Sequence, residues 1–221
     1  PYKTIYLIHG YGQDESDWMG IGSAPNIMDN LISEGRTEPA VLVSISNNNG
    51  AMGEQKDGFA NLFNVILPFV EKNYNVSTKA EDRSLSGLSM GSRYTKYVME
   101  TDATAFGYYG LYSCSETIKM ETPNLDKAHI FVGVGCFEAS NYMNATNTNT
   151  ANLEAAGSYY ASLKVAGYHD FNTWDQLLRI YIEDYLWNPA AFGDEPAEPA
   201  LKPGPNVIKD PASPTGYTVK F

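Results

Sequence analysis

The chain has 221 residues, of which 43% are hydrophobic, and a formal net charge of −11. This length suits one domain with a sizeable core, or one domain followed by a tail. The acidic balance, with no basic cluster, argues against nucleic acid as a partner, and no apolar run is long enough to span a membrane.

Two apolar strands are predicted in the first part of the chain. The first covers residues 4–8 and ends at His9-Gly10, and the second covers residues 40–45. A helix is predicted over residues 59–74, where apolar side chains recur at helical spacing. Its apolar face comprises Leu62, Phe63, Ile66, Phe69 and Val70.

The pentapeptide Gly87-Leu88-Ser89-Met90-Gly91 is the most informative motif of the chain. In a G-x-S-x-G sequence the serine sits on a strained strand-to-helix turn, and the glycines remove Cβ clashes. The pattern also occurs by chance, so its context matters. A short strand is predicted before it, over residues 83–86, and helical spacing follows over residues 91–100. This context favours Ser89 as a nucleophile.

The remaining elements continue the alternation of strands and helices. Strands are predicted over residues 106–112 and 129–135, and helices over residues 153–164 and 174–187. Nearly all-apolar strands that alternate with helices predict an α/β fold, in which a mostly parallel sheet is covered by helices on both faces. Functional residues of such sheets gather at the carboxyl ends of the strands.

The ends of the chain differ from this pattern. Seven of the twelve prolines lie between Pro189 and Pro214. We therefore expect one domain over residues 1–190 and a proline-rich segment or linker over residues 191–221. The chain starts at Pro1 without a signal peptide, so we expect that it has been processed, trimmed or excised.

A serine nucleophile needs a base, and the chain has three histidines. In folds with this serine turn, the chain order is serine, acid, histidine. His9 precedes the serine, and His129 begins a strand at the remote end of the sheet. His169 follows in a loop before a helix, so we predict that it is the base.

The acid that orients the histidine is expected after the strand over residues 129–135. Glu138 is the first carboxylate there, and the alternative is that it is merely a solvated loop residue. Asp126 precedes that strand, and Asp170 is too close to the histidine to orient its ring from behind. Glutamate can serve in this position as well as aspartate.

Two backbone amides must stabilise the oxyanion of an acyl transfer. The amide of Met90, at the start of the helix after the serine, is the first candidate. The second is the amide of Tyr11, with Gly12 as the alternative. His9 is then expected to hold this loop in place.

Two tryptophans and two cysteines have open roles. Trp18 and Trp174 are predicted either to wall a pocket for an aromatic acyl group or a sugar, or to pack in the core. Cys114 and Cys136 follow consecutive strands. They form either a disulfide or two separate buried thiols.

Several of these motifs together resemble a known family. They are Ile5-Tyr6-Leu7-Ile8-His9-Gly10, Asp14-Glu15-Ser16-Asp17-Trp18, the serine pentapeptide, and Gly167-Tyr168-His169-Asp170 with Trp174. Over residues 4–187 the chain resembles the esterase D-like family and, within it, feruloyl esterases of carbohydrate esterase family 1.

The resemblance implies an α/β-hydrolase that releases ferulate or related acids from arabinose side chains of xylan, with no cofactor and no metal. It implies a secreted, extracellular enzyme, whose partners are other domains of a modular enzyme that degrades plant cell walls. An acetylxylan or other small-acyl esterase is the alternative enzyme. A non-catalytic carbohydrate-binding module is the alternative from another class.

The chain also departs from the family pattern. Members have strands before the one that ends in His-Gly, so the N-terminal strands are expected to be missing here. The family often has aspartate at the position of Glu138 and glycine at the position of Tyr168. A tyrosine there is expected to narrow the pocket or to stack on a ring of the substrate.

Overall fold

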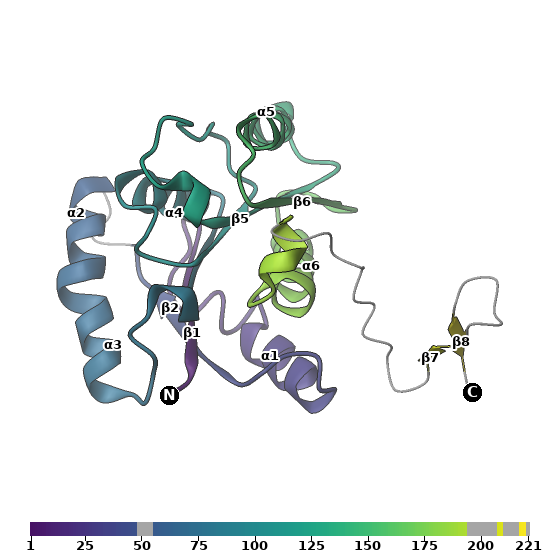
Figure 1. Cartoon of the computed structure of the whole chain (residues 1–221), viewed down its shortest axis with the longest axis horizontal. Helices are drawn as coiled ribbons and strands as arrows, with labels where there is room; N and C mark the ends of the chain where they lie inside the picture. The colour runs from purple at the N-terminus through teal and green to yellow at the C-terminus, as the bar shows by residue number, and fades with distance from the viewer. Residues whose placement is uncertain (48–54, 194–206, 210–216, 220–221) are drawn as a thin grey trace.

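Six parallel strands form the centre of the molecule. The computed structural model describes residues 1–47, 55–193, 207–209 and 217–219 (Figure 1). The strand order is β2-β1-β3-β4-β5-β6, and each neighbouring pair is parallel. The strands are β1 (Lys3–Ile8), β2 (Ala40–Ile45), β3 (Arg83–Leu88), β4 (Tyr108–Tyr112), β5 (His129–Gly135) and β6 (Tyr160–Val165).

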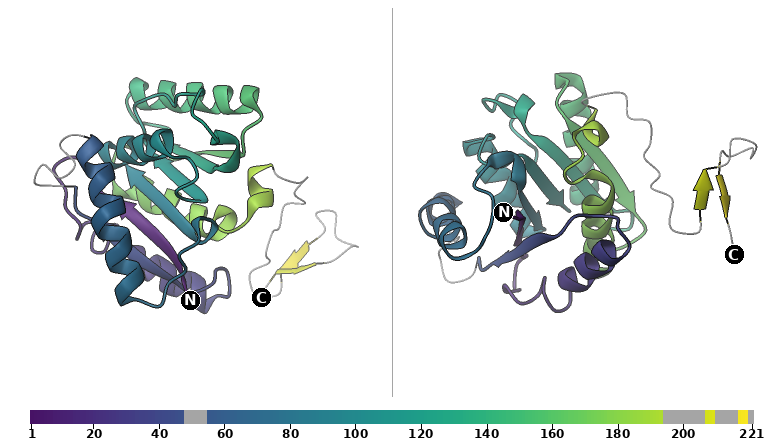
Figure 2. Two further views of the ribbon diagram at one scale, coloured as in Figure 1. Left: turned by 60° about the vertical axis from the view of Figure 1, so that its left-hand side comes forward. Right: turned by 60° about the horizontal axis from the view of Figure 1, so that its bottom comes forward.

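Helices cover both faces of this sheet, as Figures 1 and 2 show. On one face lie α2 (Gln55–Asn61), η1 (Leu62–Ile66), α3 (Leu67–Asn73), α4 (Met90–Thr101) and α5 (Ser140–Ala156). On the other lie α1 (Ala24–Ser33), α6 (Phe171–Ile180), η4 (Tyr181–Tyr185) and η5 (Pro189–Phe192). The short turns η2 (Ala80–Asp82) and η3 (Leu125–Lys127) precede β3 and β5.

Each face of the sheet has its own hydrophobic core. Alternate residues of one strand contribute to different cores: Tyr6 of β1 packs with the α4 side, whereas Ile5 and Leu7 pack with the α1 side. Strands buried on both faces are apolar along most of their length. This confirms the α/β fold expected from the sequence.

The helix predicted over residues 153–164 is wrong. Helix α5 ends at Ala156, where Gly157 takes a left-handed φ of 66°, and residues 160–165 form strand β6 beside β5. Glycine favours this helix-ending conformation because it has no Cβ. Beyond it, the exposed edge of β5 offers backbone hydrogen bonds that no local helical signal reveals.

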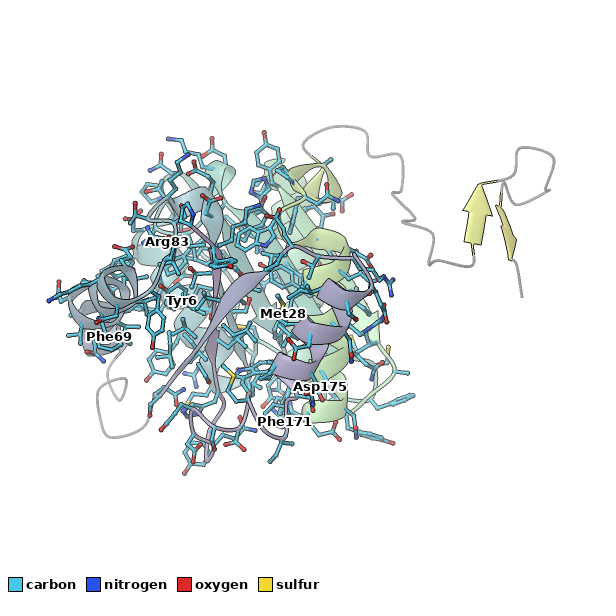
Figure 3. The ribbon with its side chains drawn as sticks, turned by 90° about the horizontal axis from the view of Figure 1, so that it is seen from below. Tyr6, Met28, Phe69, Arg83, Phe171 and Asp175 are labelled. Atoms are coloured by element: carbon cyan, nitrogen blue, oxygen red, sulfur yellow. The ribbon has the colours of Figure 1, made fainter. Side chains whose placement is uncertain are left out.

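The helix predicted over residues 59–74 is present, but it is not a regular α-helix. The π-helical η1 joins α2 to α3. An extra residue per turn shifts the residues that follow it around the helix axis. Consequently Leu62 and Val70 are buried, whereas Phe69, predicted on the same face, is 58% exposed and points away from the core (Figure 3).

The last predicted helix, over residues 174–187, starts earlier than expected. Helix α6 begins at Phe171 because the Asp170 side chain accepts hydrogen bonds from the amides of Asn172 and Thr173. The π-helical η4 continues it to Tyr185. Helix α1, in which Met28 and Leu31 are buried, was not predicted.

The packed domain extends to Phe192, which is fully buried. Within the segment predicted as a linker, β7 (Val207–Lys209) and β8 (Tyr217–Val219) form an antiparallel pair. The division of the chain at residue 190 stays a prediction. Of the helices in the described ranges, none combines the length and apolar character that crossing a bilayer requires.

Candidate active site

Ser89 occupies a strained turn between β3 and α4. Its φ is 51° and its ψ is −114°, and its amide donates to the Tyr112 carbonyl of β4 at 2.9 Å. A Cβ on Gly87 would lie 2.3 Å from the Gly91 backbone, and a Cβ on Gly91 would lie 2.3 Å from the Ile8 carbonyl oxygen. Both glycines are therefore required for α4 to pack this close to the strands.

The structure brings Ser89, His169 and Glu138 into one hydrogen-bonded chain. These residues follow β3, β6 and β5, whose carboxyl ends lie at the same edge of the sheet. The distance from His169 Nε2 to Ser89 Oγ is 2.9 Å, and from His169 Nδ1 to Glu138 Oε2 it is 2.6 Å. A carboxylate only accepts hydrogen bonds, so Nδ1 carries the hydrogen and Nε2 is free to accept one from the serine.

Glu138 is held by two further donors. Its side chain is fully buried, and its Oε1 accepts from the Ser113 hydroxyl at 2.6 Å and from the Gly135 amide at 2.8 Å. The Ser113 hydroxyl in turn accepts from Trp174 Nε1 at 3.0 Å. Both carboxylate oxygens of Glu138 therefore take part in hydrogen bonds, and these bonds fix the orientation of the buried side chain.

Ser113 is a site residue that the sequence analysis missed. It directly follows β4, at the same edge of the sheet as the other site residues, and its φ is 53°. A polar residue at a strand's carboxyl end was the available signal. Its role also depends on the pairing of β4 with β5, which a single sequence does not reveal.

Aromatic rings fix the orientation of the histidine. The Tyr142 ring stacks on the His169 ring, with centroids 4.2 Å apart and planes at 24°. The Trp174 indole meets the same imidazole edge-on at 5.0 Å. Tyr142 comes from α5, which the sequence analysis placed too late in the chain, so this contact was missed.

Hydrogen bonds of His9 and Gly10 hold the loop after β1 in place. His9 is fully buried; its Nε2 accepts from the Asn47 amide at 3.1 Å, and its Nδ1 donates to the Gly10 carbonyl at 2.8 Å. This confirms the structural role predicted for His9. The Gly10 amide donates to the Gln13 side chain at 2.7 Å. Of the two residues predicted to donate amides to the oxyanion, Tyr11 follows Gly10 in this loop, and Met90 is the first residue of α4.

An open cavity of about 480 Å³ lies beside the serine. Aromatic side chains form much of its wall: Tyr11, Tyr142, Phe171 and Trp174. Within the described part of the chain, no group of three or more His, Cys, Asp or Glu side chains is placed to hold a metal ion.

Two predicted substrate-binding residues are not in the cavity wall. Trp18 is fully buried, and its indole donates to the Ile8 carbonyl at 3.1 Å. The pocket wall predicted for Trp18 is therefore wrong, and the core alternative holds. Tyr168 is 64% exposed and lies against Phe137 instead of narrowing the cavity. Trp174 serves both predicted roles, since it is buried and also lines the cavity.

The two cysteines are not bridged. Cys114 is buried, as one alternative expected, whereas Cys136 is exposed. Burial raises the pKa of the Cys114 thiol, so this side chain stays neutral.

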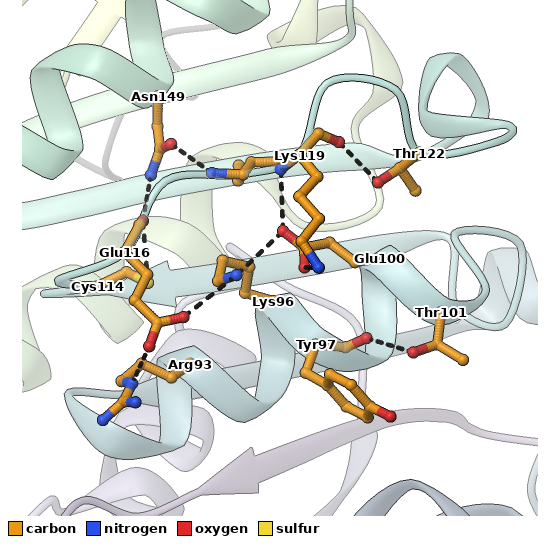
Figure 4. A network of polar contacts seen from close by, with 11 residues as sticks. Arg93, Lys96, Tyr97, Glu100, Thr101, Cys114, Glu116, Lys119, Thr122 and Asn149 are labelled. Atoms are coloured by element: carbon orange, nitrogen blue, oxygen red, sulfur yellow. Dashed lines mark hydrogen bonds and ion pairs between the residues drawn. The ribbon is translucent and has the colours of Figure 1, made fainter. Parts of the chain in front are cut away.

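A polar network ties α4 to the loop that follows Ser113 (Figure 4). Lys96, only 7% exposed at its side chain, contacts Glu100 at 3.0 Å and Glu116 at 3.2 Å. Arg93 binds the other oxygen of Glu116. Burial alone would raise the pKa of Glu116, but its bonds to Arg93 and Lys96 lower it below the ordinary value. Asn149 of α5 closes the network by donating to the Glu116 carbonyl.

Comparison with known proteins agrees with this geometry. The sequence model of the family described as "Putative esterase" matches residues 1–181. Over 185 residues the chain is 32% identical to an endo-1,4-beta-xylanase/feruloyl esterase of Xylanibacter ruminicola; the match covers 80% of this chain and 25% of that protein. The chain thus spans about a quarter of the length of this relative.

Solved structures with the same fold are more distant in sequence. A ferulic acid esterase of family CE1 from Anaeromyces mucronatus, in complex with ferulic acid, has a TM-score of 0.74 at 19% identity, covering 86% of this chain and 80% of that one. An enterobactin esterase from Shigella flexneri has a TM-score of 0.70 at 19% identity, covering 86% and 55%. Because the family match includes both the serine turn and the histidine loop, this chain belongs to that esterase family and has the α/β-hydrolase fold.

Proposed function

We propose that this chain is a serine carboxylic ester hydrolase that releases ferulate or related hydroxycinnamates from arabinoxylan. The observation that carries the proposal is the hydrogen-bonded chain from Ser89 through His169 to Glu138, beside an aromatic cavity. Acyl transfer requires a base that is hydrogen-bonded to the nucleophile and an acid that is hydrogen-bonded to the base, and these three residues have both contacts.

In the proposed reaction, the Ser89 hydroxyl attacks the ester carbonyl while His169 Nε2 takes its proton. Glu138 holds the imidazole in the required tautomer and stabilises the imidazolium. The amides of Met90 and Tyr11 bind the oxyanion of the tetrahedral intermediate. The imidazolium then protonates the sugar oxygen as its bond to the acyl carbon breaks, so that the sugar leaves with a free hydroxyl and the acyl group stays on Ser89. Water activated by His169 hydrolyses this acyl-enzyme.

Two observations support an aromatic acyl group. The cavity presents the rings of Tyr142, Phe171 and Trp174 to a bound acid, and aromatic pairs favour offset or edge contacts. A relative with 32% identity is named a xylanase/feruloyl esterase. That name also supports a modular enzyme, and a cell-wall substrate would require secretion from the cell.

The test compares hydrolysis of methyl ferulate and of 4-nitrophenyl acetate by the full chain and by a Ser89→Ala variant. We expect a higher kcat/KM for the ferulate, and a loss of at least about a thousandfold in the variant. Preference for the acetate would instead indicate a small-acyl esterase. If the folded chain hydrolysed neither ester, the catalytic proposal would fail, and a carbohydrate-binding module would remain.

A further inference from the structure

Two large aromatic side chains lie together in solvent beside the site. Phe137 is 59% exposed and Tyr168 is 64% exposed. Their ring centroids are 5.3 Å apart, with the planes tilted by 40°. A side-by-side pair of exposed rings leaves apolar area in water that a compact domain would otherwise bury, so such a pair often marks a binding surface.

The backbone beneath the two rings is firmly connected. The Phe137 amide donates to the Gly167 carbonyl at 3.0 Å, and the Cys136 amide donates to the Val165 carbonyl at 2.8 Å. The Tyr168 carbonyl accepts from the Asp170 amide at 2.9 Å and from the Thr173 hydroxyl. The loops after β5 and β6 therefore fix the backbone that carries the two rings before any ligand arrives, which lowers the entropy lost on binding.

The pair is adjacent to the site in sequence and separate from its cavity. Phe137 precedes Glu138, and Tyr168 precedes His169, so the Cα atom of each aromatic residue lies about 3.8 Å from that of a residue of the hydrogen-bonded chain. Glu138 is fully buried while Phe137 projects outward. Neither aromatic residue lines the cavity that takes the acyl group.

We propose that Phe137 and Tyr168 form a platform that binds the sugar part of the ester substrate. This inference rests on the proposed function, because an acyl group in the cavity leaves its attached glycan outside. Aromatic rings stack on the apolar C–H faces of pyranose rings, and the tyrosine hydroxyl offers a hydrogen bond. A net charge of −11 favours a neutral glycan over a polyanion.

The test uses two substrates that carry the same acyl group. One is methyl ferulate, and the other is a feruloylated arabinoxylo-oligosaccharide. In the Phe137→Ala/Tyr168→Ala double variant we expect the ratio of kcat/KM, oligosaccharide over methyl ester, to fall about tenfold. The matched control is Phe69→Ala, an equally exposed ring on α3, far from the cavity residue Phe171 (Figure 3), which should leave the ratio unchanged.

Two outcomes would overturn the platform. An unchanged ratio would show that the rings do not contact the glycan. An equal loss on both substrates would show that the substitutions act by displacing Glu138 or His169. Either result would leave another domain or protein as the occupant of this surface.

A binding measurement separates this proposal from the proposed function. If the unaltered chain hydrolyses no ferulate ester, the proposed function fails, and calorimetry with the unesterified arabinoxylo-oligosaccharide decides the platform. We expect Ser89→Ala to bind this oligosaccharide and the added Phe137→Ala/Tyr168→Ala changes to weaken binding about tenfold. Equal affinities, or no binding to either chain, would overturn the platform.

Discussion

Two serines with left-handed backbone conformations meet in the site. Ser89 and Ser113 have φ values of 51° and 53° and directly follow the neighbouring strands β3 and β4. Non-glycine residues in this region are held there at some conformational cost. In this site the strained backbone places one hydroxyl against His169 and the other against Glu138.

A Ser113→Ala variant should lower kcat on methyl ferulate about tenfold and leave KM nearly unchanged. The lost hydroxyl is a donor to the buried Glu138 carboxylate, and hydrogen bonds to charged groups contribute about 1.5 kcal/mol or more. Ser113 does not line the cavity, so acyl binding is not directly affected. Steady-state kinetics would measure both constants.

Ser113→Gly is the matched control, because it also removes the hydroxyl but relieves any strain at the left-handed φ. An equal loss of kcat in both variants would assign the effect to the hydroxyl. Full kcat in either variant would contradict the role in positioning Glu138.

Asp175 should make the protein less stable as pH rises. Burial raises the pKa of this α6 carboxyl from 3.8 to about 6, and its Oδ1 has no hydrogen-bond partner. The folded state therefore holds the proton more tightly than the unfolded state does. The destabilisation is absent below pH 3.8, grows up to about pH 6 and is complete above it.

We expect Asp175→Asn to stabilise the protein by about 1 kcal/mol at pH 7, since a shift of this size in a partly exposed group must be discounted for solvent screening. This corresponds to a rise in Tm of about 3 °C. At pH 3 the gain should vanish. Thermal unfolding at both pH values measures it, and a gain that persists at pH 3 would contradict the assigned cause. Figure 3 shows Asp175 on α6.

Residue-scale prediction worked where chain order restricted the choice. With three histidines and one serine turn, order and elimination selected Ser89, His169 and Glu138, which the structure brings together. It did not decide the role of Trp18, for which a pocket wall and core packing both stayed open, because its neighbours in sequence, Asp14 to Asp17, are polar. The loop instead turns its indole inward to the Ile8 carbonyl.

At the scale of elements, strands were easier to predict than helices. Strands buried on both faces are largely apolar, and β1, β2, β4 and β5 were found in this way. Strand β3, which carries Arg83, Ser84 and Ser86, was predicted from its place before the serine turn. The sixth, β6, has polar and partly exposed positions and depends on pairing with β5. The π-helical segments η1 and η4 escaped because periodicity assumes a regular helix.

The junction between β3 and α4 should tolerate no side chain at its second glycine. A Gly91→Ala substitution puts a Cβ 2.3 Å from the Ile8 carbonyl oxygen, which is backbone of β1 and cannot rotate away. We expect the free energy of unfolding to fall by at least about 3 kcal/mol, or the chain not to fold. Urea unfolding would measure it.

A Gly157→Ala substitution, just after α5, tests the cost of a left-handed backbone conformation without a steric clash. Its φ is 66°, and a Cβ there would meet no neighbouring atom within 4 Å. Left-handed strain alone predicts a loss of about 1 kcal/mol. Equal destabilisation by the two alanines would contradict the packing explanation for Gly91.

At the scale of the whole molecule, both cores and the site lie between Ile5 and Phe192. We expect a chain that ends at Gly193 to fold and to hydrolyse 4-nitrophenyl acetate with the kcat/KM of the full chain. Parallel kinetics and thermal unfolding of the two chains would test this. A folded but inactive shorter chain would show that the proline-rich segment contributes to the site.

In the loops after β5 and β6, a residue that faces solvent directly precedes a residue of the hydrogen-bonded chain, and this arrangement affects how the sequence can evolve. Glu138 and His169 contact each other, while the residues just before them, Phe137 and Tyr168, face solvent. Tyr11, on the loop after β1, is 86% exposed in the same way. Under the proposed function, point mutations at these outward positions would change the surface that meets the substrate and leave Glu138 and His169 in place. Selection for a new ester could therefore proceed one codon at a time while turnover is retained.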